Sequence, residues 1–143
     1  MSISISYLKA SDLMRDPIIV KPDISVSDAL ATILNEGIGA LLVVNEKNEL
    51  VGIVTKRDIL WALKYRASDA KYLKVKDIMK KNPITVTSDT SIVDIVNIML
   101  QHNISHIPVV EDGKLIGIIS DRELLEVLSE LFDKLLQRGE ATE

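Results

Sequence analysis

The chain has 143 residues, of which 47% are hydrophobic and 27% are charged, so it can bury one sizeable core or two small fused cores. A formal net charge of −4 argues against a protein whose whole surface binds nucleic acid or an anionic membrane. The absence of cysteine excludes disulfides, thiolate metal sites and a cysteine nucleophile. We find neither a signal-peptide pattern nor an apolar run of bilayer-spanning length, and we therefore expect a cytoplasmic protein without membrane contact.

The first half of the chain predicts a β-α-β-β-α unit. Ser25 is a suitable N-cap for a helix with Asp28 three residues later, and Gly37 suits the left-handed residue that ends a helix. The continuous apolar run Ala40–Val44 is typical of a strand covered on both faces. The expected order is a strand at 17–20, a helix between 25 and 37, strands at 40–44 and 50–54, and a second helix from about 56.

The second half of the chain repeats the first, and a repeat decides the fold class before any single motif does. Asp12 and Met14 recur 65 residues later as Asp77 and Met79, and Leu50, Gly52 and Arg57 recur at the same offset as Leu115, Gly117 and Arg122. One β-α-β-β-α copy would leave a sheet face bare, so we expect an α/β (α+β) fold in which two copies pack through their sheets. We place the first repeat at 11–62, a linker at 63–75 and the second repeat at 76–127.

The last helix is expected to extend beyond the second repeat, to about residue 137. Leu124, Leu128, Leu131 and Leu135 are spaced i, i+4, i+7 and i+11, which puts them on one face of that helix. This face either packs on its own domain or meets a partner subunit, and the second interpretation predicts a homodimer. At the other end of the chain, residues 2–7 alternate like a strand that is either frayed or added to a sheet edge.

A basic segment joins the two copies. Between Lys64 and Lys81 there are seven Lys or Arg residues and two Asp residues, which gives a local charge of +5. A solvated linker surface is the simpler interpretation. A nucleic-acid-binding surface is the less favoured alternative, and a steep salt dependence of binding would reveal it.

The strand-to-helix junction after residue 54 carries the residues best suited to ligand chemistry. Thr55 offers a hydroxyl, Arg57 offers a planar donor fork suited to phosphate, and Asp58 offers two acceptor oxygens for the hydroxyls of a ribose. The same residues also fit a variant of the capping box, a pattern that occurs at three other places in this chain. The local pattern alone therefore leaves helix capping and ligand binding open.

Several motifs together resemble the cystathionine-β-synthase (CBS) domain. Each copy begins with the sequence pattern Asp-Leu/Ile-Met. Each ends with the pattern hydrophobic-Gly-hydrophobic-hydrophobic-Thr/Ser-x-x-acid at the junction between a strand and a helix. The second copy also contains the sequence SHIPVV at 105–110. The pair, over roughly Ser11–Leu125, resembles a stand-alone tandem CBS module of the Bateman type. The resemblance implies repeats packed about a pseudo-two-fold axis, clefts that bind AMP, ADP, ATP or S-adenosylmethionine, a regulated partner protein, and dimerisation.

The resemblance also implies which residues line the two clefts. The main cleft is expected to contain Thr55, Arg57, Asp58, Pro83, Ile84, Thr85, Ser105, His106, Ile107 and Pro108. A second cleft is expected to contain Pro17, Ile18, Ile38, Gly39, Ala40, Leu41, Ser120, Arg122 and Glu123. In this cleft Glu123 stands where the family has an Asp for the ribose, and Leu42 where it has Pro. We therefore expect the second cleft to be weak, empty or selective for another ligand.

Other kinds of site fit the sequence less well. His102 and His106 are four residues apart, but a helix-to-strand break is expected between them and no glutamate completes a zinc motif. Without a nucleophile triad or paired carboxylates in a plausible cleft, we expect no catalytic residue, resident cofactor or metal. The sequence thus predicts a non-enzymatic sensor of adenosyl ligands that shifts conformation and signals to a partner. A dimerisation scaffold with empty clefts is the alternative.

Overall fold

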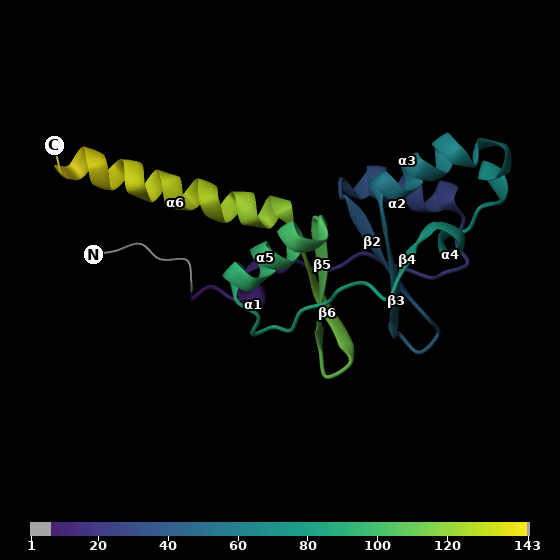
Figure 1. The fold of residues 1–143 in the computed structure, drawn as a ribbon, viewed down its shortest axis with the longest axis horizontal. Coiled ribbons are helices and arrows are strands. Elements are labelled where there is room, and N and C mark those ends of the chain that lie inside the picture. The colour runs from purple at the N-terminus through teal and green to yellow at the C-terminus, as the bar shows by residue number, and fades with distance from the viewer. Residues whose placement is uncertain (1–6, 143) are drawn as a thin grey trace.

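The computed structural model describes residues 7–142, with side chains described up to residue 137, so the strand considered for residues 2–7 falls almost wholly outside it. The elements in chain order are α1 Ala10–Leu13, β1 Ile19–Val20, α2 Val26–Glu36, β2 Ala40–Val44, β3 Leu50–Thr55, α3 Lys56–Tyr65, the 3-10 helix η1 Ala67–Tyr72, α4 Val75–Ile78, β4 Lys80–Lys81, α5 Ile92–His102, β5 His106–Glu111, β6 Lys114–Ser120 and α6 Asp121–Thr142. Figure 1 shows the strands in the middle of the molecule, with α2 and α3 beside one set and α1 and α5 beside the other.

Two sheets pack against each other between these helices. The first has the strand order β1-β2-β3-β4, and the second consists of β5 and β6. Ala40, Leu42 and Ile53 of the first sheet form a buried cluster with Ile118 of the second. Because side chains alternate along a strand, Leu41 and Val43 of β2 pack instead with residues of α2 and α3. The predicted α/β fold, two repeats packed through their sheets, is confirmed.

The helix boundaries follow from the capping residues that the sequence contains. The Ser25 hydroxyl accepts a hydrogen bond from the Asp28 amide at 2.9 Å, which satisfies one free N–H at the start of α2. The corresponding ends of α2 and α5 are Gly37, with φ of 63°, and Asn103, with φ of 51°. Both residues adopt the left-handed conformation expected of a helix C-terminus.

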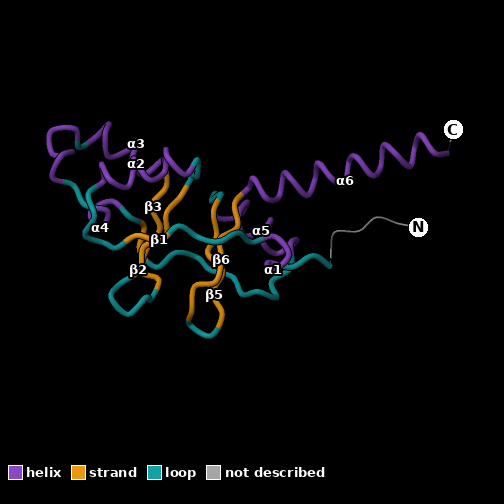
Figure 2. The backbone as a smooth tube through the Cα atoms, turned by 180° about the vertical axis from the view of Figure 1, so that it is seen from behind, coloured by secondary structure: helices purple, strands orange, loops and turns teal. Residues whose placement is uncertain are grey.

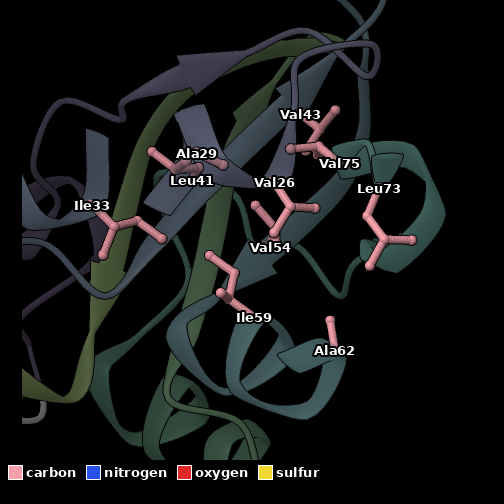
Figure 3. Close-up of a cluster of buried hydrophobic side chains, with 10 residues drawn as sticks. All are labelled: Val26, Ala29, Ile33, Leu41, Val43, Val54, Ile59, Ala62, Leu73 and Val75. Carbon is pink, nitrogen blue, oxygen red and sulfur yellow. The ribbon is translucent and has the colours of Figure 1, made fainter. Parts of the chain in front are cut away.

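The short helices α1 and α4 are exchanged between the repeats. Ala10 of α1 lies in the core of the second repeat, and its amide donates to the Thr90 carbonyl oxygen at 2.8 Å. Val75 of α4 lies in the core of the first repeat (Figure 3), and its amide donates to the Ile24 carbonyl oxygen at 2.9 Å. Each repeat thus completes the hydrophobic core of the other, which couples the two into one unit.

The first strand of the second repeat is reduced to a single bridge between Val86 and Val109. In the first repeat, the Leu42 amide donates to the Ile18 carbonyl oxygen at 3.0 Å as β1 pairs with β2. Pro108 stands at the position of Leu42 and has no N–H to donate, so the same ladder cannot form. The segment that precedes Val86 contributes β4, which pairs with β3 of the first repeat, and the equivalent Arg15 bridges to Ile118 of β6.

Helix α6 projects away from the two sheets in both views (Figures 1 and 2). It continues to Thr142, beyond the end expected near residue 137. The leucine stripe is divided: Leu124 packs against the core of the second repeat, whereas Leu128 and Leu135 are exposed together with Phe132. In the described part of the chain, no helix combines the length and the apolar character that crossing a membrane requires.

Candidate functional site

The junction between β3 and α3 is held by a reciprocal cap. The Asp58 amide donates to the Thr55 hydroxyl oxygen at 3.2 Å, while Asp58 Oδ2 accepts from the Thr55 amide at 2.9 Å and from its hydroxyl at 3.0 Å. Asp58 is only 8% exposed although it is charged. Because the carboxylate accepts both of its hydrogen bonds through Oδ2, its second oxygen, Oδ1, has no hydrogen-bond donor among the described residues. A buried carboxylate with a free acceptor oxygen is a strong binding group for a ligand hydroxyl.

The junction between β6 and α6 uses its carboxylate differently. Glu123 is 5% exposed, and its Oε1 accepts from the Ser120 amide at 2.9 Å while its Oε2 accepts from the Ser120 hydroxyl at 2.9 Å. The extra methylene lets both oxygens reach the N-cap residue. Because both Glu123 oxygens are engaged, this junction offers a ligand less acceptor capacity than the Asp58 junction does.

Each carboxylate also has a basic partner from the other repeat. Lys80 Nζ lies 3.8 Å from Asp58 Oδ1, and Arg15 lies 3.9 Å from Glu123 Oε2. Lys80 is positioned by pairing with Ile53 of β3. Arg15 is positioned by a bridge to Ile118 of β6. We call residues 55–58 with 80–81 the first half-site, and residues 120–123 with 15–16 the second half-site.

Both half-sites border one cavity of about 770 Å³ between the repeats, a volume typical of small-molecule sites. The predicted residues that line it are Thr55, Arg57, Ser105, His106, Ile18, Ile38, Gly39, Ala40, Ser120, Arg122 and Glu123. The segments that the resemblance assigns to separate clefts therefore meet in one space. The predicted residues outside its lining are Asp58, Pro83, Ile84, Thr85, Ile107, Pro108, Pro17 and Leu41.

Some of these residues are outside the lining because they belong to the hydrophobic cores. Ile107 and Leu41 have no exposed surface. Ile84 and Thr85 are exposed, and the strand expected there is reduced to the bridge between Val86 and Val109. The sequence analysis missed five charged lining residues, Arg15, Asp16, Lys56, Lys80 and Asp121. Lys56 and Asp121 lie inside the junction motif, so their position in the repeat could have identified them.

His106 lies between the two half-sites. Its Nδ1 is 3.2 Å from the Ser105 hydroxyl, and its ring lies against the backbone of Gly39 in the other repeat. Burial is the main cause that lowers the pKa of His106. Asp121 and Glu123 oppose this shift in pKa, and Lys56 and Arg15 add to it. Charges of both half-sites therefore act on one imidazole.

Comparison with known proteins settles the family. The model of the CBS domain matches residues 10–65 and again residues 75–130. The chain belongs to the CBS domain family. It is 36% identical over 111 residues to an uncharacterised 17.7 kDa protein of Acidianus ambivalens, covering 77% of this chain and 66% of that protein. It is also 33% identical to inosine-5′-monophosphate dehydrogenase of Methanocaldococcus jannaschii over 80% of this chain, but the CBS match spans only 22% of that enzyme.

Solved CBS domain pairs share the arrangement. The CBS domain pair of protein MJ0100, solved with 5′-methylthioadenosine and S-adenosyl-L-methionine, has a TM-score of 0.79 and 28% identity, covering 87% of this chain and 98% of that one. The protein CBSX2, solved in complex with AMP, has a TM-score of 0.74 and 29% identity, covering 86% and 97%. The predicted tandem CBS pair is thereby confirmed.

Two other features of the CBS pair concern metal binding and nucleic-acid binding. Within residues 7–142, no three His, Asp or Glu side chains are grouped so that they could hold a metal ion. The basic segment is partly neutralised, because Lys76 lies 2.9 Å from Asp23 and Arg66 lies 3.8 Å from Asp69. Lys80 lines the cavity and lies 3.8 Å from Asp58. Two of the seven basic residues of this segment thus face a nearby carboxylate, and a third, Lys80, lines the cavity.

Proposed function

We propose that this CBS pair is a regulatory module that binds an adenosyl ligand in the cavity between its repeats and signals to a partner protein. The observation that carries the proposal is the buried Asp58, whose Oδ1 has no hydrogen bond and whose neighbours Thr55, Lys56 and Arg57 line the 770 Å³ cavity. The ligands named for MJ0100 and CBSX2 support the same class of ligand. AMP, ADP, ATP and S-adenosylmethionine are the candidates.

The mechanism follows from the shared walls of the cavity. A ligand there contacts both repeats at once, because Thr55 and Ile38 come from one repeat and His106 and Ser120 from the other. It therefore favours the relative geometry of the repeats that fits it best, and a partner that contacts both repeats reads this shift in population. The proposal assigns no reaction to the chain. A cysteine-free sensor of adenosyl ligands fits the cytoplasm.

We also propose that the module is a homodimer. Apolar side chains are exposed at corresponding positions of the two helical layers: Leu34 and Leu60 in the first repeat, Leu100 and Leu125 in the second. Exposed patches of this kind mark interaction surfaces, and a two-fold contact buries the same patch on both chains. A scaffold with an empty cavity would share this surface, so dimerisation alone does not separate the two functions.

Mass spectrometry of the small molecules released from the purified protein tests the sensing function directly. We expect an adenosyl compound in stoichiometric amount after denaturation of the protein. As a control, Asp58→Ala protein purified in parallel should release much less of it. A wild-type protein that releases none, and that binds none of the four candidates when they are added, would favour the scaffold.

A further inference from the structure

The two half-sites differ in charge at positions that the repeat makes equivalent. Lys56 and Asp121 are the first residues of α3 and α6. Their amides make the same contact, since Lys56 N donates to the Gly39 carbonyl oxygen at 3.1 Å and Asp121 N to the Ser105 carbonyl oxygen at 2.9 Å. The backbone is therefore the same at both positions, while the side-chain charge is reversed. Both residues line the cavity.

A second reversal lies in the two segments that carry the basic partners of the carboxylates. Lys80 and Arg15 are equivalent, but Lys80 is followed by Lys81 and Arg15 by Asp16. Counted over the residues that define them, the first half-site has four basic residues and one acidic residue, a net charge of +3. The second half-site has two basic and three acidic residues, a net charge of −1. Two charge reversals in the repeat thus separate the half-sites by four charges.

The equivalent arginines of the two half-sites, Arg57 and Arg122, also differ in how available their positive charge is to an anion. Arg122 Nε lies 3.3 Å from Glu126 Oε1, one turn along α6. The position equivalent to Glu126 is Trp61, so Arg57 has no acidic residue one turn along α3. The guanidinium of Arg57 is therefore more available to an anion than that of Arg122.

We propose that the half-sites take adenosyl ligands of different charge: the first takes a phosphorylated nucleotide, and the second an uncharged or cationic adenosyl compound such as a thioether or sulfonium nucleoside. This inference rests on the proposed function and assigns a ligand class to each side of the cavity. At the first half-site, Lys56 and Arg57 attract phosphate while Asp58 Oδ1 accepts from a ribose hydroxyl. At the second, Asp121 and Asp16 repel phosphate and attract a positive sulfur.

Titration calorimetry of the full chain with ATP and with S-adenosylmethionine tests the assignment. We expect each to bind once per chain, and saturation with one to leave the stoichiometry of the other at one. ATP affinity should fall steeply with salt, whereas the affinity for 5′-methylthioadenosine, which is uncharged, should change little. Two equivalent ATP sites per chain would overturn the inference.

Charge-reversal variants locate the two ligands. Lys56→Asp should weaken ATP at least about tenfold, equivalent to about 1.4 kcal/mol, and Asp121→Lys should weaken S-adenosylmethionine to a similar extent. Lys47→Asp and Glu46→Lys make the same charge changes in the turn between β2 and β3. That turn lies about 20 Å from the junction, the length of a six-residue strand. This is beyond the screening length of about 8 Å at physiological salt, so both controls should bind as wild type.

The outcomes separate the two proposals. If neither ATP, S-adenosylmethionine nor 5′-methylthioadenosine binds, the sensing function fails. If they bind but Lys56→Asp and Asp121→Lys have no more effect than the controls, the sensing function stands and the charge assignment is wrong. Because Lys56 and Asp121 are exposed at helix starts, both variants should fold, and circular dichroism and thermal melting would verify this.

Discussion

The Nε2 atom of His106 lies 2.7 Å from the position that a Cβ atom on Gly39 would occupy. A side chain larger than hydrogen at residue 39 would therefore overlap the imidazole, since contacts this short are not tolerated between a Cβ and a heavy atom. The two residues belong to different repeats and both line the cavity. Their contact couples the relative position of the repeats to the shape of the ligand-binding space.

We expect Gly39→Ala to lower the free energy of unfolding by about 1–3 kcal/mol, because the added methyl group displaces the His106 ring. Urea unfolding measures this loss. His106→Ala in the same chain should remove the clash, so the double-mutant cycle should show coupling between the residues. Gly37→Ala is the matched control: its added Cβ meets no atom within 4 Å, and its cost, which arises from φ of 63°, should be independent of residue 106.

His106 should make stability depend on pH. Its pKa is lowered in the folded state, chiefly by burial, from an ordinary value of 6.5. Between these two pKa values the unfolded chain binds the proton and the folded chain does not. The contribution to stability is therefore complete above about pH 6.5 and declines as the pH falls toward the folded-state pKa.

Urea unfolding at pH 7.5 and pH 5.5 measures this effect when wild type is compared with His106→Asn. The loss of stability on acidification should be larger for wild type than for the variant, because only wild type carries the imidazole. The carboxylates titrate in both proteins, so the difference between them isolates residue 106. Equal losses would show that His106 does not titrate differently in the folded and unfolded chains.

The elements that local residues specify could be predicted from the sequence. Ser25 at a helix start, Gly37 at its end and the apolar run of β2 each determine structure within a few residues. The repeat then implied that the sheets pack together. The repeat pattern also predicts a first strand in the second repeat. That strand is reduced to a single bridge because Pro108 has no N–H to donate.

The arrangement of the cavity depends on contacts between distant residues, which no local pattern contains. Lys80 reaches Asp58 only because β4 pairs with β3 of the other repeat. His106 lies against Gly39 only because the two repeats pack together at these residues. The motif therefore identified Thr55 and Asp58, whereas the charges that surround them required the tertiary structure.

The free oxygen of Asp58 leads us to expect unequal effects of truncating the two buried carboxylates. Asp58→Ala removes a charged acceptor for a ribose hydroxyl, worth about 1.5–3 kcal/mol, so nucleotide affinity should fall by about 10- to 150-fold. Glu123→Ala should change nucleotide affinity much less, because both oxygens of Glu123 are already engaged by Ser120. Calorimetric titration of both variants measures the difference.

Both substitutions also remove a helix cap, so binding must be separated from stability. Ser25→Ala removes only a cap, at a cost of about 1 kcal/mol, and Ser25 is not part of the cavity lining. It should lower the melting temperature without changing nucleotide affinity. If Glu123→Ala abolishes nucleotide binding while Asp58→Ala preserves it, the roles assigned to the two half-sites are inverted.

A bound adenosyl ligand should raise the melting temperature. A ligand that binds only the folded chain adds about 2.7 kcal/mol at a hundredfold excess over Kd. For a domain of this size, that corresponds to a shift of roughly 5–10 °C. Differential scanning calorimetry with AMP, ADP, ATP, S-adenosylmethionine and NAD, each at millimolar concentration, should show at least one such shift. The absence of a shift with all five would support the empty scaffold.

The exposed helical faces should pair two chains at micromolar concentration. Light scattering is expected to give about twice the chain mass of 15.9 kDa. The structure offers two candidate interfaces. One is the projecting part of α6, and the other is the face of α2, α3, α5 and the start of α6 that exposes Leu34, Leu60, Leu100 and Leu125. Leu128→Glu with Phe132→Glu places charge on the first, and Leu34→Glu with Leu60→Glu places the same charge on the second.

These two double variants decide which face forms the dimer, because burying an unpaired carboxylate in an interface costs more than the apolar contact contributes. All four side chains are at least 41% exposed in the single chain, so the fold should survive either change. We expect the variant at the interface to become monomeric and the other to remain a dimer, which makes each the control for the other. A wild-type chain that scatters as 15.9 kDa throughout would refute dimerisation altogether.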